Sequence, residues 1–197
     1  MDTPGTIMQT CTSCGAQHAV AFQPSVNVTR TPSLREKIAS GEYFIWECPR
    51  CGAKNLIRQP FLLHDEKERL MILLTDARVK SEGLPEGYTG RIVRSAGDLV
   101  EKLKIFDSGL DDIVMELCKY VTLGELRIDV PLRFVSAGGA DSEMTFTYPK
   151  GSDMEMIAVG FNVYEDCAGI VRRNPEMRRA AEGLVCVDRE WLAQFVA

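Results

Sequence analysis

Long hydrophobic runs are absent from this sequence. The longest aliphatic stretch, Leu70 to Leu74, is far too short to span a membrane as a helix or to form the apolar region of a signal peptide. The first residues also lack the basic cluster that precedes such a region. We therefore expect a cytoplasmic protein with no membrane partner.

Motifs that bind nucleotides or activate a serine are absent too. The phosphate-binding pattern G-x-x-x-x-G-K-[ST], the dinucleotide pattern G-x-G-x-x-G and the hydrolase pattern G-x-S-x-G do not occur. Histidine is scarce, because the chain has only His18 and His64. These absences favour a protein that is not an enzyme.

A surplus of basic charge is missing as well. The chain has 23 lysine and arginine residues against 28 aspartate and glutamate residues, a net charge of −5, so it has no general electrostatic attraction to nucleic acid. Its 197 residues are 45% hydrophobic and 26% charged, which is the composition of an ordinary globular protein with a sizeable core.

Cysteine is present in a recognisable pattern. Four of the seven cysteines form two C-x-x-C-G pairs, and these are Cys11, Cys14, Cys48 and Cys51. Tetrahedral zinc prefers four such thiolates, and the glycine suits the tight turn that wraps two sulfurs around one ion. The sequence therefore predicts a structural zinc site, although iron in the same four-sulfur cage is also compatible with the pattern.

The same cysteines allow a redox interpretation. A redox C-x-x-C pair usually begins a helix, whose dipole lowers the pKa of one thiol, but neither pair here precedes a helical pattern. The odd number of cysteines also fits a reducing compartment better than a disulfide framework. The structural metal site is therefore the main prediction, and a thiol-redox enzyme is the alternative for these cysteines.

The histidines lie near the cysteine pairs in the sequence. Four thiolates already complete a zinc site, so we expect His18 beside the ligands or on the surface. The dipeptide His64-Asp65 is either a polar hairpin corner or an imidazole held by a carboxylate, which can act as a base or a pH switch. A hydrolytic enzyme that uses His64 and Asp65 is thus a further alternative.

Basic residues accompany the second cysteine pair. Arg50, Lys54 and Arg58 follow the aromatic segment from Tyr43 to Trp46. Cations that contact phosphates, beside aromatic side chains that stack on bases, are typical of surfaces that bind single-stranded nucleic acid. A nucleic-acid-binding zinc ribbon is therefore the alternative function.

The first 80 residues predict extended chain with one short helix. Thr31 and Pro32 suit the start of a helix that ends at Gly41. The expected strands are Val26–Val28, Tyr43–Trp46, 55–63 and 68–75, with a corner at His64–Lys67. We expect these strands to form a zinc-ribbon-like antiparallel sheet with the metal at one end.

A glycine- and proline-rich stretch, residues 81–90, suggests a linker to a second unit that covers residues 91–197. Capping patterns at Ser95 and Ser108 predict two helices there, and Asn174 and Asp188 predict helix starts near the end. The expected strands are 130–136, 143–148 and 155–161. The sequence thus predicts an α+β fold, with a zinc ribbon at residues 1–80 and a mixed helix and antiparallel-sheet unit after the linker.

The region from the first cysteine pair to about Thr75 resembles the CpXC family, a group of prokaryotic proteins named for two Cys-Pro-x-Cys motifs. The resemblance rests on the segments Gly41-Glu42, Val26-Asn27-Val28-Thr29, Cys48-Pro49-Arg50-Cys51-Gly52 and Leu62-Leu63-His64-Asp65, and the region from Arg91 to Lys119 is similar to longer members. Thr12 stands where the family has proline, and Leu63 replaces an aromatic residue. The resemblance implies a bacterial zinc-ribbon-like protein, and it implies no activity.

These observations together indicate a zinc-binding protein that acts as a protein-interaction or regulatory scaffold. A closed four-thiolate site has no open position for a substrate, and the chain is acidic and lacks a catalytic constellation. We therefore expect the partner to be another protein, with nucleic acid as the alternative partner.

Overall fold

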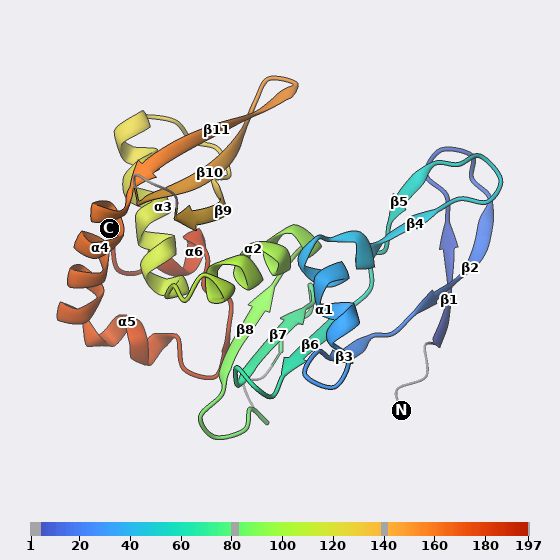
Figure 1. The fold of residues 1–197 in the computed structure, drawn as a ribbon, viewed down its shortest axis with the longest axis horizontal. Coiled ribbons are helices and arrows are strands. Elements are labelled where there is room, and N and C mark those ends of the chain that lie inside the picture. Colours follow the sequence, from blue (N-terminus) through green and yellow to red (C-terminus); the bar gives the residue numbers. More distant parts are fainter. Residues whose placement is uncertain (1–4, 80–82, 139–141, 197) are drawn as a thin grey trace. The chain divides into compact units, whose positions relative to one another are not determined.

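The computed structural model describes residues 5–79, 83–138 and 142–196. Within these ranges the chain forms two compact units, one up to Val100 and one from Glu101 onward, and each is described by itself. Both units contain helices and antiparallel strand pairs (Figure 1). The predicted mixed α+β class is therefore confirmed.

The N-terminal unit contains most of the strands. Its elements are β1 (Gly5–Thr10), β2 (Gln17–Phe22), β3 (Ser25–Asn27), α1 (Pro32–Ala39), the 3-10 turn η1 (Glu42–Phe44), β4 (Ile45–Glu47), β5 (Lys54–Leu56), β6 (Phe61–Asp65), β7 (Leu70–Leu74) and β8 (Thr89–Val93). Helix α2 (Ala96–Asp107) begins in this unit. The helix predicted between Thr31 and Gly41 is confirmed as α1.

These strands do not form one antiparallel sheet. Strands β1 and β2 pair as one antiparallel hairpin, and β4 and β5 pair as another. The remaining strands lie in the order β8-β7-β6-β3, where β6 and β7 are antiparallel but β3 pairs with β6, and β8 with β7, in parallel. The prediction of a purely antiparallel sheet is wrong for this part, because long connections allow parallel pairing that local sequence does not reveal.

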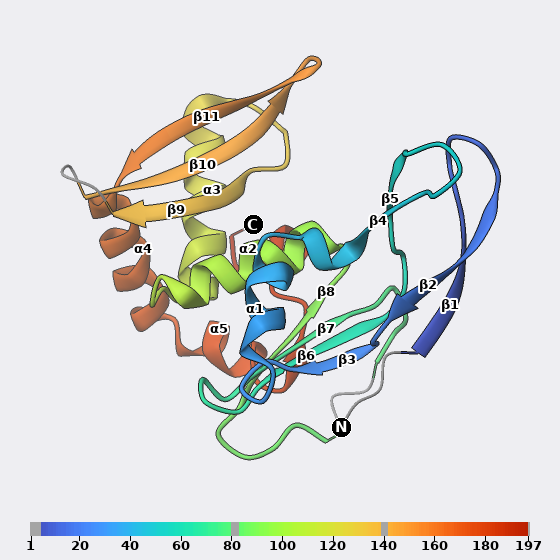
Figure 2. The same ribbon diagram turned by 45° about the vertical axis from the view of Figure 1, so that its right-hand side comes forward.

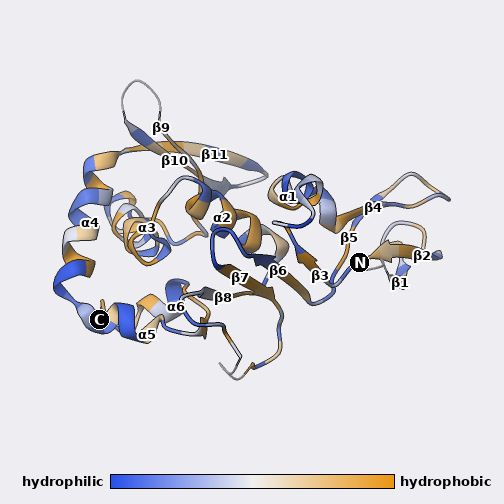
Figure 3. Cartoon of the chain, turned by 60° about the horizontal axis from the view of Figure 1, so that its bottom comes forward, coloured by the Kyte–Doolittle hydropathy of each residue, from blue (hydrophilic) through white to orange (hydrophobic). Residues whose placement is uncertain are grey.

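Buried and partly exposed side chains alternate along β6 and β7, and this alternation sets which face of the sheet is buried. In both strands every second side chain is buried, among them Leu63 and Ile72, neither of which is accessible to solvent. Figure 3 shows β7 and the first part of β6 coloured as hydrophobic, with α1 on one side of the sheet. Because side chains alternate between the faces of a strand, this pattern sets which face carries the core.

A cluster of four aromatic rings joins the hairpins to the sheet. Phe61 at the start of β6 contacts Phe22, Tyr43 and Phe44, with ring centroids 5.2 to 6.1 Å apart. The Tyr43 hydroxyl donates to the backbone carbonyl of Gln23 at 2.8 Å. Tyr43 and Phe44 were predicted to lie in a strand, but they lie in the 3-10 turn, and the strand begins only at Ile45. In the turn, both rings contact Phe61.

The strand predicted over residues 55–63 is wrong, since β5 ends at Leu56 and β6 begins at Phe61. Pro60 lies in the break, and proline cannot donate a ladder hydrogen bond. The two halves also belong to different sheets, with β5 paired to β4 and β6 paired to β3 and β7. The break moves the chain from the cysteine hairpin into the larger sheet.

The C-terminal unit packs helices on a three-stranded antiparallel sheet. Its elements are α3 (Asp112–Leu126), β9 (Arg133–Gly138), β10 (Glu143–Lys150), β11 (Asp153–Gly160), α4 (Phe161–Arg173), α5 (Pro175–Ala180), β12 (Leu184–Val185) and α6 (Arg189–Leu192). The strand order is β11-β10-β9, and Figure 2 shows α3 against this sheet. Phe134, Met144 and Phe146 from the sheet form one core with Met115 and Leu192 from the helices.

Two expectations for this unit need correction. Ser108 does not cap α3, because its hydroxyl donates to the carbonyl of Lys104 at 2.8 Å. The cap is Asp111, whose carboxylate accepts from the backbone N–H groups of Ile113 and Val114. The helix α4 was not predicted, because it follows β11 directly with no capping side chain at Gly160. The helix starts at Asn174 and Asp188 are confirmed as α5 and α6.

The domain boundary expected at residues 81–90 stays a prediction. Part of that segment, residues 81–82, lies outside the described ranges. Strand β8 begins inside this segment, at Thr89, and pairs with β7 of the N-terminal unit, which extends to Val100. In the described part of the chain, every helix is too short or too polar to cross a membrane.

Candidate metal centre

The two cysteine pairs occupy matching backbone turns. In the first turn the carbonyl of Cys11 accepts a hydrogen bond from the N–H of Gly15 at 2.9 Å, and in the second the carbonyl of Cys48 accepts from Gly52 at 2.8 Å. Gly15 and Gly52 have φ angles of 69° and 70°, in the left-handed region that glycine adopts without steric cost. The glycine of each C-x-x-C-G motif therefore has a backbone role, and the two turns are built alike.

The turns bring all four sulfur atoms together. The Sγ atoms of Cys11, Cys14, Cys48 and Cys51 lie within 4.8 Å of one another. Cys11 and Cys51 are 3.7 Å apart, and so are Cys14 and Cys48. A tetrahedron with metal–sulfur bonds of about 2.3 Å has edges of about 3.8 Å. The four cysteines are therefore a group that can hold one tetrahedral metal ion.

Backbone groups favour the charged form of one thiol. The N–H groups of Cys14 and Ser13 donate toward the Cys11 sulfur and lower its pKa to about 6, although burial opposes them. At Cys51 the N–H of Ala53 acts in the same direction, but desolvation and hydrogen bonds with the other thiols raise the pKa to about 12. Four thiols this close cannot all ionise without a cation, which a bound metal supplies.

His18 lies beside the sulfur cluster. Its Nε2 atom is 3.5 Å from the Sγ of Cys48, and its ring centroid is 6.0 Å from that of Trp46. The side chain projects from β2 and is half-buried. His18 is thus placed to hydrogen-bond to a thiolate, and the four sulfurs leave it outside the ligand set.

Asn55 is a site residue that the sequence analysis missed. Its side chain, only 5% exposed, donates to the Cys11 Sγ at 3.6 Å and to the Ala53 carbonyl at 2.8 Å. Its Oδ1 atom accepts from the backbone N–H and the hydroxyl of Thr12 at 2.8 and 2.9 Å. Asn55 therefore ties the second cysteine turn to the first. The available signal was a polar residue at the inward position of a strand, just after the motif.

Asp65 has a structural role in the loop after β6. It accepts hydrogen bonds from the Thr29 hydroxyl at 2.9 Å and from the N–H groups of Lys67 and Glu68 at 3.1 and 3.2 Å. The Nε atom of Arg35 lies 3.5 Å from the Oδ2 atom of Asp65. Burial by itself raises the pKa of Asp65, but the bonds from Glu68 and Thr29 and the charge of Arg35 outweigh it and lower the pKa.

His64 does not form a pair with Asp65. Their side chains lie on opposite faces of β6, with Asp65 buried and His64 partly exposed. His64 instead contacts the Tyr88 hydroxyl through Nε2 at 3.3 Å and the Asn27 amide through Nδ1 at 3.5 Å. The carboxylate-held imidazole considered from the sequence is therefore absent from this geometry.

The basic residues Arg50, Lys54 and Arg58 are exposed but do not form one face with aromatic rings. Lys54 on β5 pairs in register with Glu47, and Arg58 lines a cavity away from the cysteines. Phe44 and Trp46, which were expected to stack on bases, are 0% and 7% exposed. Buried rings offer no stacking surface, so Phe44 and Trp46 are not available to bases, whereas Tyr43, the third aromatic residue of the expected face, is partly exposed.

Comparison with known proteins places the chain in a family. No curated protein and no solved structure matches it. The sequence model of the family described as CpXC protein matches residues 9–119, which include all four clustered cysteines and more than half of the chain. On this match, and with the paired cysteine turns that the structure brings together, the chain belongs to the CpXC family.

Proposed function

We propose that the four cysteines bind one structural zinc ion and that the two cysteine hairpins form a zinc ribbon. The observation that carries this proposal is the pair of 3.7 Å sulfur–sulfur distances, each between one turn and the other. These distances match the edge of a zinc–thiolate tetrahedron. The donor set also fits iron, so the experiment must identify the metal.

The ion would join two hairpins. Strands β1 and β2 carry one turn, and β4 and β5 carry the other, so a single ion bound by both turns closes a chain segment of about 40 residues, as the separation of Cys11 and Cys51 shows. Structural zinc contributes on the order of 10 kcal/mol or more to the folding of small modules. Because protein sulfurs fill all four positions, the ion would stabilise the fold and not bind a substrate.

The test is the metal content of protein purified without added metal, measured by mass spectrometry, with a thiol titration before and after chelation. We expect one zinc per chain and four thiols that react only after chelation. Cys48→Ser should lose the metal, whereas Cys186→Ser, outside the cluster, should keep it. Iron in place of zinc would overturn the identity of the metal. A ready disulfide between the turns without metal would support the redox interpretation.

We further propose that this ribbon belongs to a protein-interaction scaffold. The support is an apolar pair on the outer face of β4–β5, where Ile45 and Leu56 lie opposite each other and are 46% and 48% exposed. Adjacent exposed aliphatic side chains on a rigid hairpin are a common feature of protein-binding surfaces. The buried aromatic rings and the net charge of −5 favour a protein over a nucleic acid as partner.

A photo-crosslinking residue at Ile45 or Leu56 tests this surface in cells. We expect one adduct of discrete mass from each position and none from Lys67, an exposed control on another loop. In parallel, binding of labelled oligonucleotides is measured at low and high salt. Tight, salt-dependent oligonucleotide binding that Arg50→Gln weakens would replace the protein partner by nucleic acid.

A further inference from the structure

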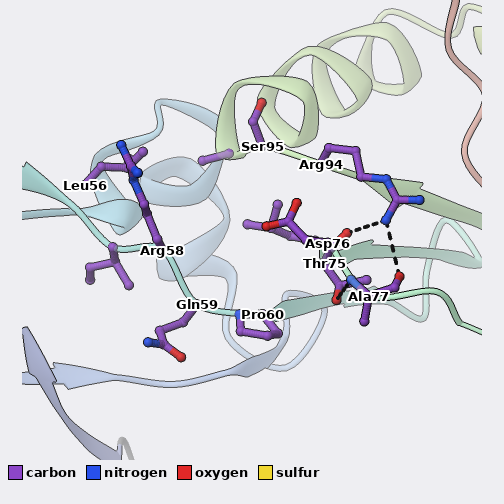
Figure 4. Close-up of a pocket in the computed structure, with 12 residues that line it drawn as sticks. Leu56, Arg58, Gln59, Pro60, Thr75, Asp76, Ala77, Arg94 and Ser95 are labelled. Carbon is purple, nitrogen blue, oxygen red and sulfur yellow. Dashed lines mark hydrogen bonds between the residues drawn. The ribbon is translucent and has the colours of Figure 1, made fainter. Parts of the chain in front are cut away.

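A cavity of about 520 Å³ lies in the N-terminal unit, apart from the cysteine cluster. Figure 4 shows its walls, which come from three segments: Leu56–Pro60 between β5 and β6, Leu74–Ala77 after β7, and Arg94–Ala96 at the start of α2. The parallel strands β7 and β8 both end at this cavity. In open sheets, ligands commonly bind outside the carboxyl ends of parallel strands.

The cavity wall is held in place by hydrogen bonds. The Nη1 atom of Arg94 donates to the backbone carbonyls of Thr75 and Ala77, at 2.7 and 3.3 Å (Figure 4). The Thr75 hydroxyl accepts from the N–H of Ala77 at 3.1 Å. Arg94 therefore braces the segment after β7, and the cavity is formed before any ligand arrives.

The lining combines apolar surface with three charged side chains, Arg58, Asp76 and Arg94, of which Arg94 is engaged with the backbone carbonyls of Thr75 and Ala77. The apolar part consists of Leu56, Ile57, Pro60, Leu74, Ala77 and Ala96. Arg58 and Asp76 line different sides of the cavity, as Figure 4 shows. Both are exposed. In the part of the chain that the structure describes, neither has a hydrogen bond or an ion pair with another side chain.

We propose that this cavity binds a zwitterion with an apolar body, namely an apolar amino acid or a short apolar peptide with free ends. The ligand carboxylate would pair with Arg58 and the ligand ammonium with Asp76, while the apolar body covers the aliphatic lining. A simple anion would meet the Asp76 carboxylate, and a simple cation would meet Arg58 and Arg94. A ligand with both charges satisfies both groups, and the volume lies within the range of small-molecule sites.

The experiment uses the full-length metal-loaded protein and calorimetric titration with L-leucine, leucinamide and N-acetyl-leucine. We expect saturable binding of L-leucine and about tenfold weaker binding of each capped form, because each cap removes one charge-assisted pair. A further titration uses leucyl-leucine, which has the same two charged ends and a longer apolar body. Comparing its affinity with that of L-leucine shows whether the cavity prefers a peptide or a free amino acid. Absence of saturable binding by L-leucine and by the dipeptide would overturn the proposal.

Two variants assign the orientation. Arg58→Gln should weaken L-leucine binding about tenfold and should not weaken leucinamide binding, because leucinamide has no carboxylate for Arg58 to pair with. Asp76→Asn should weaken L-leucine binding to the same degree and should not weaken N-acetyl-leucine binding, because that ligand has no ammonium group for Asp76 to pair with. Arg172→Gln, at an exposed arginine outside both the cavity and the cysteine cluster, is the matched control and should have no effect. A uniform loss with all ligands would contradict the assigned pairing, and equal melting temperatures would exclude unfolding as its cause.

Discussion

The cysteine hairpins and the C-terminal unit are stabilised in different ways. Along β1–β2 and β4–β5, the buried side chains are Phe22, Trp46 and Asn55, and the turns add Cys11 and Cys48. The C-terminal unit, in contrast, buries a continuous core of aromatic and aliphatic side chains on α3, α4, α6 and its sheet. The hairpins have little apolar surface to bury, so under the proposed function they would rely on a metal bound by the cysteines, whereas the C-terminal unit depends on packing.

Charged groups reinforce this contrast. In the C-terminal unit, Lys102 pairs with Asp112 at 2.9 Å and with Glu116 at 3.4 Å, and Lys119 pairs with Glu116 at 2.8 Å. All four are almost fully buried, and each has an opposite charge beside it. The neighbouring carboxylates raise the pKa of Lys119, although burial alone would lower it. In the hairpins, a metal ion bound as proposed would supply the compensating charge for the thiolates.

Removal of the metal should have the largest effect and should separate the two regions. Chelation should unfold the hairpins, since zinc contributes on the order of 10 kcal/mol or more to such modules. Hydrogen exchange measured by mass spectrometry should show lost protection in β1, β2, β4 and β5 and unchanged protection in β9–β11. Equal loss in both regions would show that the C-terminal core also depends on the metal.

A large-to-small substitution in the C-terminal core should have the opposite effect. It should destabilise the C-terminal unit and leave the metal content unchanged. Phe146 is fully buried in that core, so Phe146→Ala should reduce the free energy of unfolding by about 3–5 kcal/mol. Chemical denaturation followed by circular dichroism measures this loss, and metal content should stay at the wild-type value. Phe195→Ala, at a partly buried position beside the same core, is the milder control. Metal loss in Phe146→Ala would show that the metal site depends on the C-terminal core, contrary to the comparison of the two regions.

Asn55→Ala tests the polar link between the cysteine turns. The change leaves the N–H and hydroxyl of Thr12 without their partner and removes a donor to Cys11. We expect a loss of about 1–3 kcal/mol in stability and a metal affinity lower by about 10–100-fold. Competition with a coloured chelator measures the affinity. Unchanged affinity would mean that Asn55 supports only the backbone.

The smallest expected effect concerns pH and Asp65. Its pKa is lowered in the folded protein, so its stabilising contribution is present above the unfolded value of about 3.9 and is lost as pH falls through the folded value. Asp65→Asn should therefore be less stable than wild type at pH 7, and the difference should shrink below pH ~4. Urea unfolding of both proteins at each pH gives this difference in the free energy of unfolding. Metal loss at low pH affects both proteins equally and therefore cancels in the difference. A constant difference would rule out the ionised carboxylate as the cause.

The sequence alone determined the features that depend on short chain segments. The C-x-x-C-G spacing indicates a thiolate metal site because the tight turn and its glycine are local. The same holds for α1 after Thr31, for α2 after Ser95, and for the alternating strands of the C-terminal sheet. These elements follow from caps, periodicity and turn residues that neighbours in the chain supply.

Only the tertiary structure decided how distant segments meet. The parallel pairing of β3 with β6 joins residues more than 30 positions apart, and the contact of Asn55 with Cys11 and Thr12 spans more than 40. The same holds for the cavity between Arg58 and Asp76. Such arrangements depend on long-range packing, for which no local pattern in a single sequence carries the information.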